Sequence, residues 1–136
     1  MKSLITLATT LALATTAPAA ELFVSVHTGS PMAQGAAMVL ATQAQQQQAQ
    51  VRVLLCDAAG DIAVQGAESP ALKPRNVTPQ QMLVSLMKGG ARVEVCALYL
   101  PNTGRQASDL LPGVTPAKPA DVAAHLLKPG VQTLAF

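Results

Sequence analysis

The chain has 136 residues, which is enough for one domain with little left for a second. Hydrophobic residues make up 50% and charged residues 12%, which excludes a fully disordered chain. A formal net charge of +2 excludes a protein that binds nucleic acid by phosphate neutralisation alone, and 2% aromatic residues argue against a base-stacking or sugar-stacking surface. The two cysteines cannot form a multiply bridged scaffold, and they do not form a Cys-x-x-Cys motif.

Residues 1–20 have the features of a signal peptide. Lys2 gives a positive start, an apolar run follows over 4–14, and Ala17 and Ala19 fit a signal-peptidase site. The apolar run is shorter than the about 20 residues that a membrane-spanning helix needs. A buried N-terminal helix or an uncleaved anchor is the alternative. We therefore expect an exported, periplasmic protein whose mature domain is 21–136, with no membrane segment after cleavage.

The mature segment begins with an alternation of strand, helix and strand. Residues 22–28 are a short apolar run that predicts a mostly buried strand. Ser30 and Pro31 are typical of an N-cap and a first helical position, and they predict a helix over 31–48. Residues 51–56 predict the second strand.

The alternation continues after an irregular stretch. Residues 57–61 predict a loop with a helical turn at 62–64, and the proline-containing stretch 67–77 predicts a mobile loop. A second cap signal at Thr78 predicts a helix over 79–88. The remaining predicted elements, in chain order, are a strand over 91–97, a turn or short helix over 98–104, a compact loop over 109–116 with a short strand near Val114, a helix over 119–128 and a strand over 131–136.

This order predicts a single three-layer α/β domain, with a mostly parallel five-stranded sheet and helices on both faces. Ligands of such sheets bind outside the carboxyl ends of the strands. The rule makes 27–31, 56–61 and 96–104 one predicted neighbourhood.

Cys96 is the first candidate for chemistry because it ends the third predicted strand. A thiol at a strand end is well placed for a nucleophile, provided that nearby groups favour the thiolate. Cysteine is also among the most buried residue types, so a purely structural thiol is the alternative.

Cys56 ends the second predicted strand at the same position as Cys96 in the third. If the two strands are neighbours in simple register, their sulfurs lie within bridging distance, and an oxidising compartment would favour a disulfide or a redox pair. Two separate buried thiols are the alternative.

His27 and Ser30 are supporting candidates. His27 ends the first strand and is placed to act as a base for Cys96, although a lone histidine is more often structural. Ser30 and the N–H groups after it could hold an anion, but its capping role already explains it. His125 is expected on the surface of the last helix without a role. No spacing predicts a metal site or a cofactor, and neither a phosphate loop nor a Gly-x-Ser-x-Gly elbow is present.

The chain resembles the DsrE/DsrF-like family of small sulfur-relay proteins over nearly its whole mature length. The resemblance is carried by these segments in order: TG at 28–29, DAAG at 57–60, KGG at 88–90, VEVC at 93–96, DLLPGV at 109–114 and VQTLAF at 131–136. It implies a five-stranded parallel sheet, assembly as a trimer or hexamer, and a cysteine at the position of Cys96 that accepts sulfur as a persulfide. It assigns no counterpart to Cys56.

The sequence is compatible with three candidate functions. The first is an exported sulfur carrier or sulfurtransferase-type protein that uses Cys96 and exchanges sulfur with a donor or acceptor protein or a small sulfur compound. The second is a non-catalytic module of the same fold that binds a small ligand or a protein. The third is a thiol–disulfide redox protein that uses both cysteines. None of them involves nucleic acid.

Overall fold

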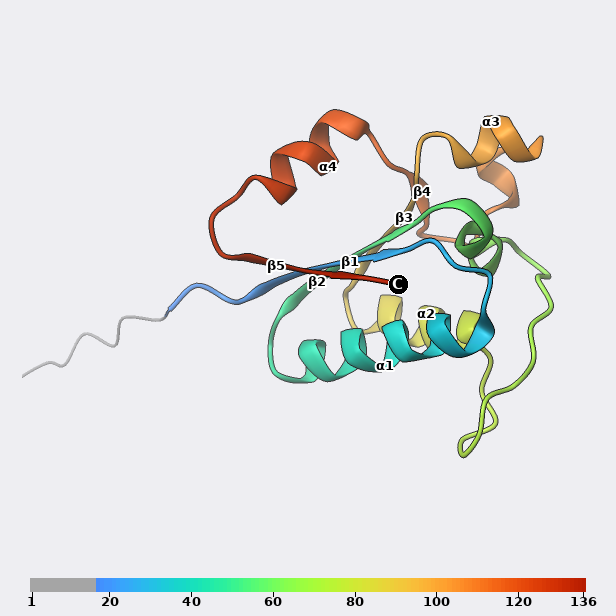
Figure 1. The fold of residues 1–136 in the computed structure, drawn as a ribbon, viewed down its shortest axis with the longest axis horizontal. Helices are drawn as coiled ribbons and strands as arrows, with labels where there is room; N and C mark the ends of the chain where they lie inside the picture. The colour runs from blue at the N-terminus through green and yellow to red at the C-terminus, as the bar shows by residue number, and fades with distance from the viewer. Residues whose placement is uncertain (1–16) are drawn as a thin grey trace, which may run out of the picture.

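Five parallel strands form the central sheet (Figure 1). The computed structural model describes residues 17–136, so most of the predicted signal peptide lies outside the described residues. The sheet order is β4-β3-β2-β1-β5, which places the first two strands in the middle. The strands are β1 (Glu21–Val26), β2 (Gln50–Leu55), β3 (Arg92–Val95), β4 (Thr115–Pro116) and β5 (Val131–Ala135).

Helices cover the sheet on both sides (Figure 1), so the predicted three-layer α/β fold is confirmed. The helices α1 (Pro31–Gln46) and α2 (Pro79–Lys88) pack on each other along one face. The helix α4 (Pro119–Leu126) lies on the opposite face (Figure 1). The short elements are the 3-10 helices η1 (Asp57–Ala63) and η2 (Ala107–Asp109) and the helix α3 (Tyr99–Thr103).

Local capping explains where the two long helices begin. The Ser30 side chain accepts a hydrogen bond from the Ala33 N–H and caps α1. Thr78 and Gln81 form a reciprocal capping box at the start of α2, and a proline occupies the first turn of both helices. Both predicted starts are confirmed.

The main core lies between the sheet and the pair α1/α2. The alternation of a strand sends every second side chain to this face, and those side chains join one buried cluster with the helices. Each fully buried Val, Leu or Met contributes about 1.5–3 kcal/mol relative to an exposed one. The central members are Val24, Val26, Met38, Val53, Leu55, Leu83, Leu86, Val93 and Val95.

The opposite face of the sheet is partly polar, which the sequence analysis did not foresee. Arg52 Nε donates to Glu94 Oε2 at 2.7 Å, and Arg92 donates to the other carboxylate oxygen. Glu94 is 1% exposed, and Arg52 also donates to the backbone carbonyl of Asp121 in α4 at 3.3 Å. A buried carboxylate therefore lies under α4, held by two guanidinium groups.

The prediction that His125 lies on the surface is wrong. Its ring packs on Phe23 of β1 with centroids 5.9 Å apart, and its side chain is 16% exposed. The reason is that the Phe23 side chain points to the α4 side of the sheet. The His125 ring of α4 packs on it and shields it from solvent. None of the described helices is long and apolar enough to span a membrane.

Candidate functional site

A cavity of about 680 Å³ opens at the carboxyl ends of the central strands. Its walls come from the residues that follow β1, β2 and β3, as the rule for parallel sheets predicts. The predicted neighbourhood is therefore confirmed. The lining residues are His27, Cys56, Asp57, Ala58, Asp61, Cys96, Leu98, Tyr99, Asn102 and Thr103.

Cys56 and Cys96 lie side by side in the wall of this cavity. The register of β2 and β3 pairs Leu55 with Val95, so the next residues of the two strands are the cysteines. Backbone hydrogen bonds extend the sheet to both of them: the Cys56 N–H donates to Val26 O and the Cys96 N–H donates to Leu55 O, each at 2.9 Å. Both thiols are free and half-buried.

The environment holds Cys56 in its neutral form. Burial raises the pKa of the Cys56 thiol to about 12, and hydrogen bonding with the Cys96 thiol and repulsion from its charge add to the shift. Asp57 acts in the same direction. At neutral pH, Cys56 is therefore a thiol that keeps its proton.

His27 reaches the site, whereas Ser30 is not among the residues that line the cavity. The His27 ring is exposed at the rim, and its Nε2 forms a 2.7 Å hydrogen bond with Ser25 Oγ. The Ser30 side chain caps α1. The backbone N–H of Ser30 donates a hydrogen bond to Thr28 Oγ1 at 3.0 Å. The expected anion cradle at Ser30 therefore lies apart from the thiols.

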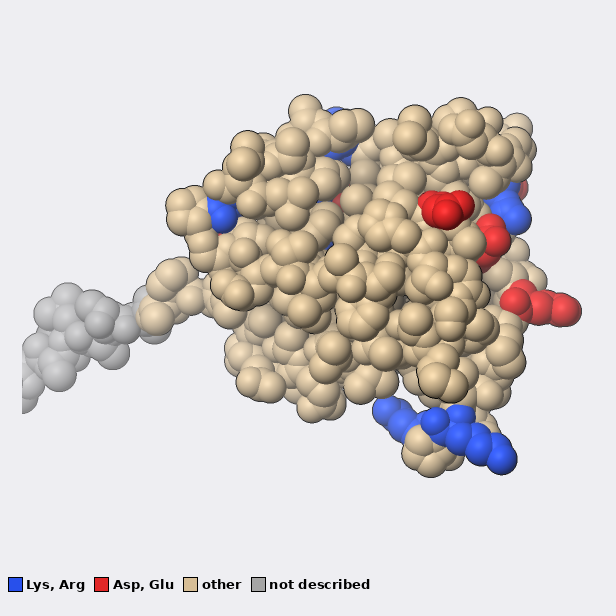
Figure 2. Space-filling model, viewed as in Figure 1, with Lys and Arg blue, Asp and Glu red and all other residues tan. Residues whose placement is uncertain are grey.

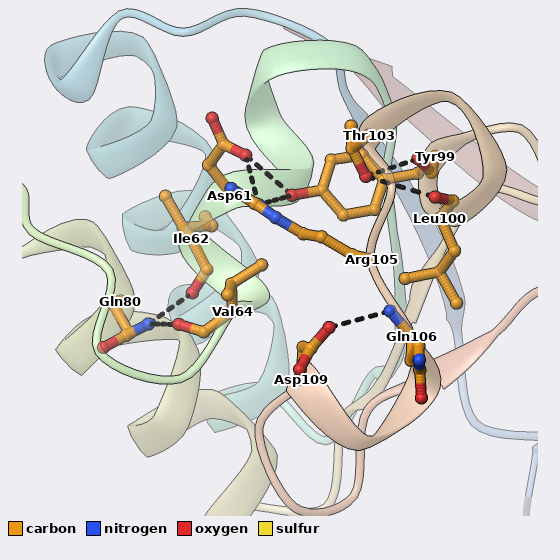
Figure 3. Close-up of polar contacts among 10 residues, drawn as sticks. All are labelled: Asp61, Ile62, Val64, Gln80, Tyr99, Leu100, Thr103, Arg105, Gln106 and Asp109. Atoms are coloured by element: carbon orange, nitrogen blue, oxygen red, sulfur yellow. Dashed lines mark hydrogen bonds and ion pairs between the residues drawn. The ribbon is translucent and has the colours of Figure 1, made fainter.

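A polar network fixes the two loops that carry the cysteines to each other (Figure 3). The Tyr99 hydroxyl donates to Asp61 Oδ1 at 2.7 Å, which links α3 to η1. Arg105 donates to the same carboxylate oxygen at 3.3 Å and to the Tyr99 hydroxyl at 3.2 Å. Its guanidinium also lies 5.9 Å from the centre of the Tyr99 ring.

The Tyr99 ring is buried and closely packed. It lies directly against Gly60, where an added Cβ would collide with the ring. Burial and the hydrogen bond to Asp61 raise the pKa of the Tyr99 hydroxyl well above its usual range, while the charge of Arg105 opposes the shift. Sequence reasoning missed this network, because Asp61 stands 38 positions before Tyr99 and 44 before Arg105. The presence of a single tyrosine in the chain was the only available signal.

A further side-chain contact anchors η1 to α2 (Figure 3). The Gln80 amide of α2 donates to the carbonyl oxygens of Ile62 and Val64 at 3.0 and 2.7 Å. The loop after Cys56 is therefore anchored to α2 on one side and to α3 on the other. Within residues 17–136, no three His, Cys, Asp or Glu side chains gather into a metal site.

Acidic and basic groups occupy different parts of one side of the molecule (Figure 2). Red carboxylate atoms appear on the right of the view, near η1 and α3, and a cluster of blue atoms projects below them at the lower right. The exposed residues Lys73 and Arg75 lie in the stretch between η1 and α2, which forms the long loop. The rim of the cavity itself carries Asp57 and Asp61.

This geometry defines the class of protein: a parallel α/β domain with a cysteine at the end of a central strand.

No family model and no curated protein matches the sequence. Solved structures share the fold, and two of them are YchN and MTH1491. The YchN protein of E. coli has a TM-score of 0.69 and 21% identity, covering 86% of this chain and 100% of its own. MTH1491, a protein of unknown function from Methanobacterium thermoautotrophicum, has a TM-score of 0.62 and 13% identity, covering 88% and 100%. The chain has the DsrE-like fold that the sequence resemblance implied.

Proposed function

We propose that this protein is a sulfur carrier of the sulfurtransferase type, and that Cys96 holds the transferred sulfur as a persulfide. The observation that carries the proposal is the position of Cys96. It follows the end of β3, lines a cavity of about 680 Å³, and is neither bridged nor fully buried. The resemblance to sulfur-relay proteins at VEVC, residues 93–96, supports the same assignment.

The reaction needs one bond to form and one to break. The Cys96 sulfur, as the thiolate, attacks the outer sulfur of a donor persulfide or of thiosulfate. A bond forms between the Cys96 sulfur and the sulfane sulfur, and the bond from that sulfur to the donor breaks. The electron pair leaves with the donor, as a thiolate or as sulfite, so the sulfane sulfur is transferred without an external oxidant.

The neighbouring groups have limited roles in this proposal. Cys56 keeps its proton and can donate a weak S–H hydrogen bond toward the sulfur on Cys96. His27 stands at the rim, where an incoming sulfur compound would pass. Ser30 caps α1 and has no chemical role in this proposal.

We also propose that the carrier is exported. The support is the pattern of residues 1–20, with its positive start, short apolar run and small residues at Ala17 and Ala19. Its donor and acceptor would then be a periplasmic protein or a small sulfur compound. The mass of the protein recovered from the periplasm tests this proposal, because cleavage near Ala20 removes the segment.

Intact mass spectrometry tests the carrier function directly. The reduced protein is measured before and after incubation with thiosulfate or polysulfide, beside Cys96→Ser and Cys56→Ser. We expect a gain of one sulfur atom that is lost in Cys96→Ser and kept in Cys56→Ser. If a protein with free thiols gains no sulfur, the carrier function is wrong, and the non-catalytic binding module takes its place.

A further inference from the structure

The two cysteines occupy matched positions on neighbouring parallel strands. Cys56 has an extended backbone, with φ −123° and ψ 162°, so the alternation of β2 continues through it. On the same strands, Arg52 and Glu94 form an ion pair on the α4 side of the sheet. Cys56 and Cys96 lie an even number of residues further along, and they line one cavity. Their side chains therefore point to the same side.

This arrangement is suited to a disulfide. Adjacent strands of a sheet lie about 4.7–4.9 Å apart. The Cα atoms of bridged cysteines are usually about 4.4–6.8 Å apart. A bond between the two sulfurs therefore needs side-chain rotation but no displacement of the strands. Backbone hydrogen bonds at Cys56 and Cys96 hold the strands in place.

We propose that Cys56 and Cys96 form a redox-active dithiol that takes a small disulfide as its substrate. The proposal is independent of sulfur transfer by Cys96. It adds a second reaction to the same cavity, and it predicts that the oxidised protein has no thiol left to accept sulfur.

The reaction proceeds by two thiol–disulfide exchanges. In the first, the Cys96 thiolate attacks one sulfur of the substrate. A mixed disulfide forms, the substrate disulfide breaks, and one half leaves as a thiolate that takes a proton. In the second, Cys56 loses its proton to solvent and its sulfur attacks the Cys96 sulfur, which expels the other half as a thiol. The pair has lost two electrons and two protons, and the substrate has become two thiols.

The burial of the Cys56 thiol favours Cys96 as the cysteine that attacks first. Cys56 resists ionisation because it is buried and because the Cys96 thiol lies beside it. Once Cys96 is held in a mixed disulfide, the contribution of its charge and hydrogen bond disappears, while the burial contribution stays. Cys56 is therefore suited to the second step and not to the first.

The volume and lining of the cavity are compatible with a small disulfide as substrate. A space of about 680 Å³ lined by Leu98, Asn102 and Thr103 can receive a disulfide with short peptide-like arms. Leu98 is 72% exposed beside the thiols and offers an apolar contact at the entrance. Oxidised glutathione is a convenient probe of this class.

The test follows both thiols of the full chain as the redox potential changes. Reduced protein is equilibrated with mixtures of reduced and oxidised glutathione, quenched with acid, alkylated with a maleimide and weighed intact. We expect the wild type to lose two hydrogens and both alkylation sites together. Cys56→Ser is expected to accumulate one glutathione on Cys96, because the resolving thiol is absent, and Cys96→Ser is expected to remain mostly unmodified.

Three results would overturn the proposal: a wild type that carries two glutathiones without a bridge, a bridge found only between two chains, or no reaction in protein whose thiols alkylate freely. Circular dichroism checks the fold of each serine variant, and the alanine variants serve as a second pair. Protection of both wild-type thiols by phenylarsine oxide, which binds paired thiols, tests their proximity without oxidation. Sulfur loading of Cys56→Ser, measured separately, decides the carrier function, so the failure of one proposal leaves the other standing.

Discussion

At the scale of single residues, Glu94 is a charged side chain that is almost completely buried. It is 1% exposed, and both of its carboxylate oxygens accept hydrogen bonds from arginine. A buried charge is tolerated only when partners replace the water that it loses, so the two guanidinium groups are a condition for its position. Arg52 is buried with it, whereas the Arg92 side chain is 56% exposed.

We predict that Arg52→Met lowers the free energy of unfolding by about 3–5 kcal/mol, because it removes the buried partner of a buried charge. Urea unfolding measures the loss. The matched control is Arg92→Met, for which the solvated partner predicts a smaller loss of about 1 kcal/mol. Replacing both members in Arg52→Met/Glu94→Leu should recover much of the stability. Equal losses in the two single variants would contradict this account.

Tyr99 offers a spectroscopic test of the network that joins the two cysteine loops. It is the one tyrosine of the chain and no tryptophan is present, so phenolate absorbance reports on it alone. Burial and the hydrogen bond to Asp61 raise the pKa of Tyr99. We therefore predict ionisation only at strongly alkaline pH in the wild type and at lower pH in Asp61→Asn.

The opposite change serves as the control for Tyr99. The positive charge of Arg105 lowers the pKa of Tyr99 and partly offsets the burial effect. Arg105→Gln should therefore raise that pKa further. If Asp61→Asn and Arg105→Gln shift the titration in the same direction, the geometry of the network is wrong.

At the scale of elements, α4 differs from α1, α2 and α3 because none of its residues is buried. Its attachment rests on a few contacts: the His125 ring on Phe23, the Asp121 carbonyl on Arg52, and Lys128, just beyond the helix, on Glu21 at 2.8 Å. Polar and aromatic contacts therefore replace the apolar packing that holds α1 and α2. This makes the docking of α4 sensitive to charge.

We predict a pH dependence of stability that depends on His125. Burial lowers its pKa below the ordinary value of 6.5, and the charge of Arg52 adds to the effect. The unfolded chain therefore binds more protons in the window just below pH 6.5, so stability rises with pH through that window and is lost on acidification. Thermal unfolding from pH 7 to about pH 5, above the ordinary range of carboxylates, measures it.

The control for this pH dependence is a matched pair of histidine variants. His125→Gln should remove the acid-side loss of stability. His27→Gln should retain it, since His27 follows the carboxyl end of β1, whereas His125 lies within 3.5 Å of Glu21 at the amino end of the same strand. If stability still falls on acidification in His125→Gln, the pH dependence comes from another titratable group.

At the scale of the whole molecule, stability is distributed unevenly between the layers. The central strands β1 and β2 are paired on both sides, and their core residues are fully buried. The edge strand β5 carries exposed residues at three of its five positions, and β4 has two exposed residues. Regions with few buried contacts open locally at lower free energy than the core.

Hydrogen exchange should follow this order. We predict that the amides of β1 and β2 exchange only through global unfolding, whereas those of α4 exchange at least about tenfold faster. Mass spectrometry of short peptides resolves the two regions. Equal protection of α4 and the central strands would show that α4 is held by more than the contacts described above, for example by a second copy of the chain.

The order of elements and the meeting of the two cysteines could be predicted from the sequence. The helix 79–88 was predicted with its observed bounds, and the strands were placed to within a few residues. The placement of Cys56 beside Cys96 followed from the equal length of two strands and a simple register, which the structure has. The sequence could not decide between two roles of Ser30, because a serine that caps a helix and a serine that binds an anion occupy the same kind of position.

The sequence by itself determined the elements, their order and the strand-end position of the candidate thiols, because capping, turn and periodicity signals act over a few residues. Only the tertiary structure decided which distant side chains meet. Arg52 and Glu94 are 42 positions apart, and Tyr99 and Asp61 are 38 apart. Their contacts depend on strand register, on the crossing of loops and on which face of the sheet a helix covers. The same long-range packing places His125 on Phe23 and leaves Cys56 neutral beside Cys96.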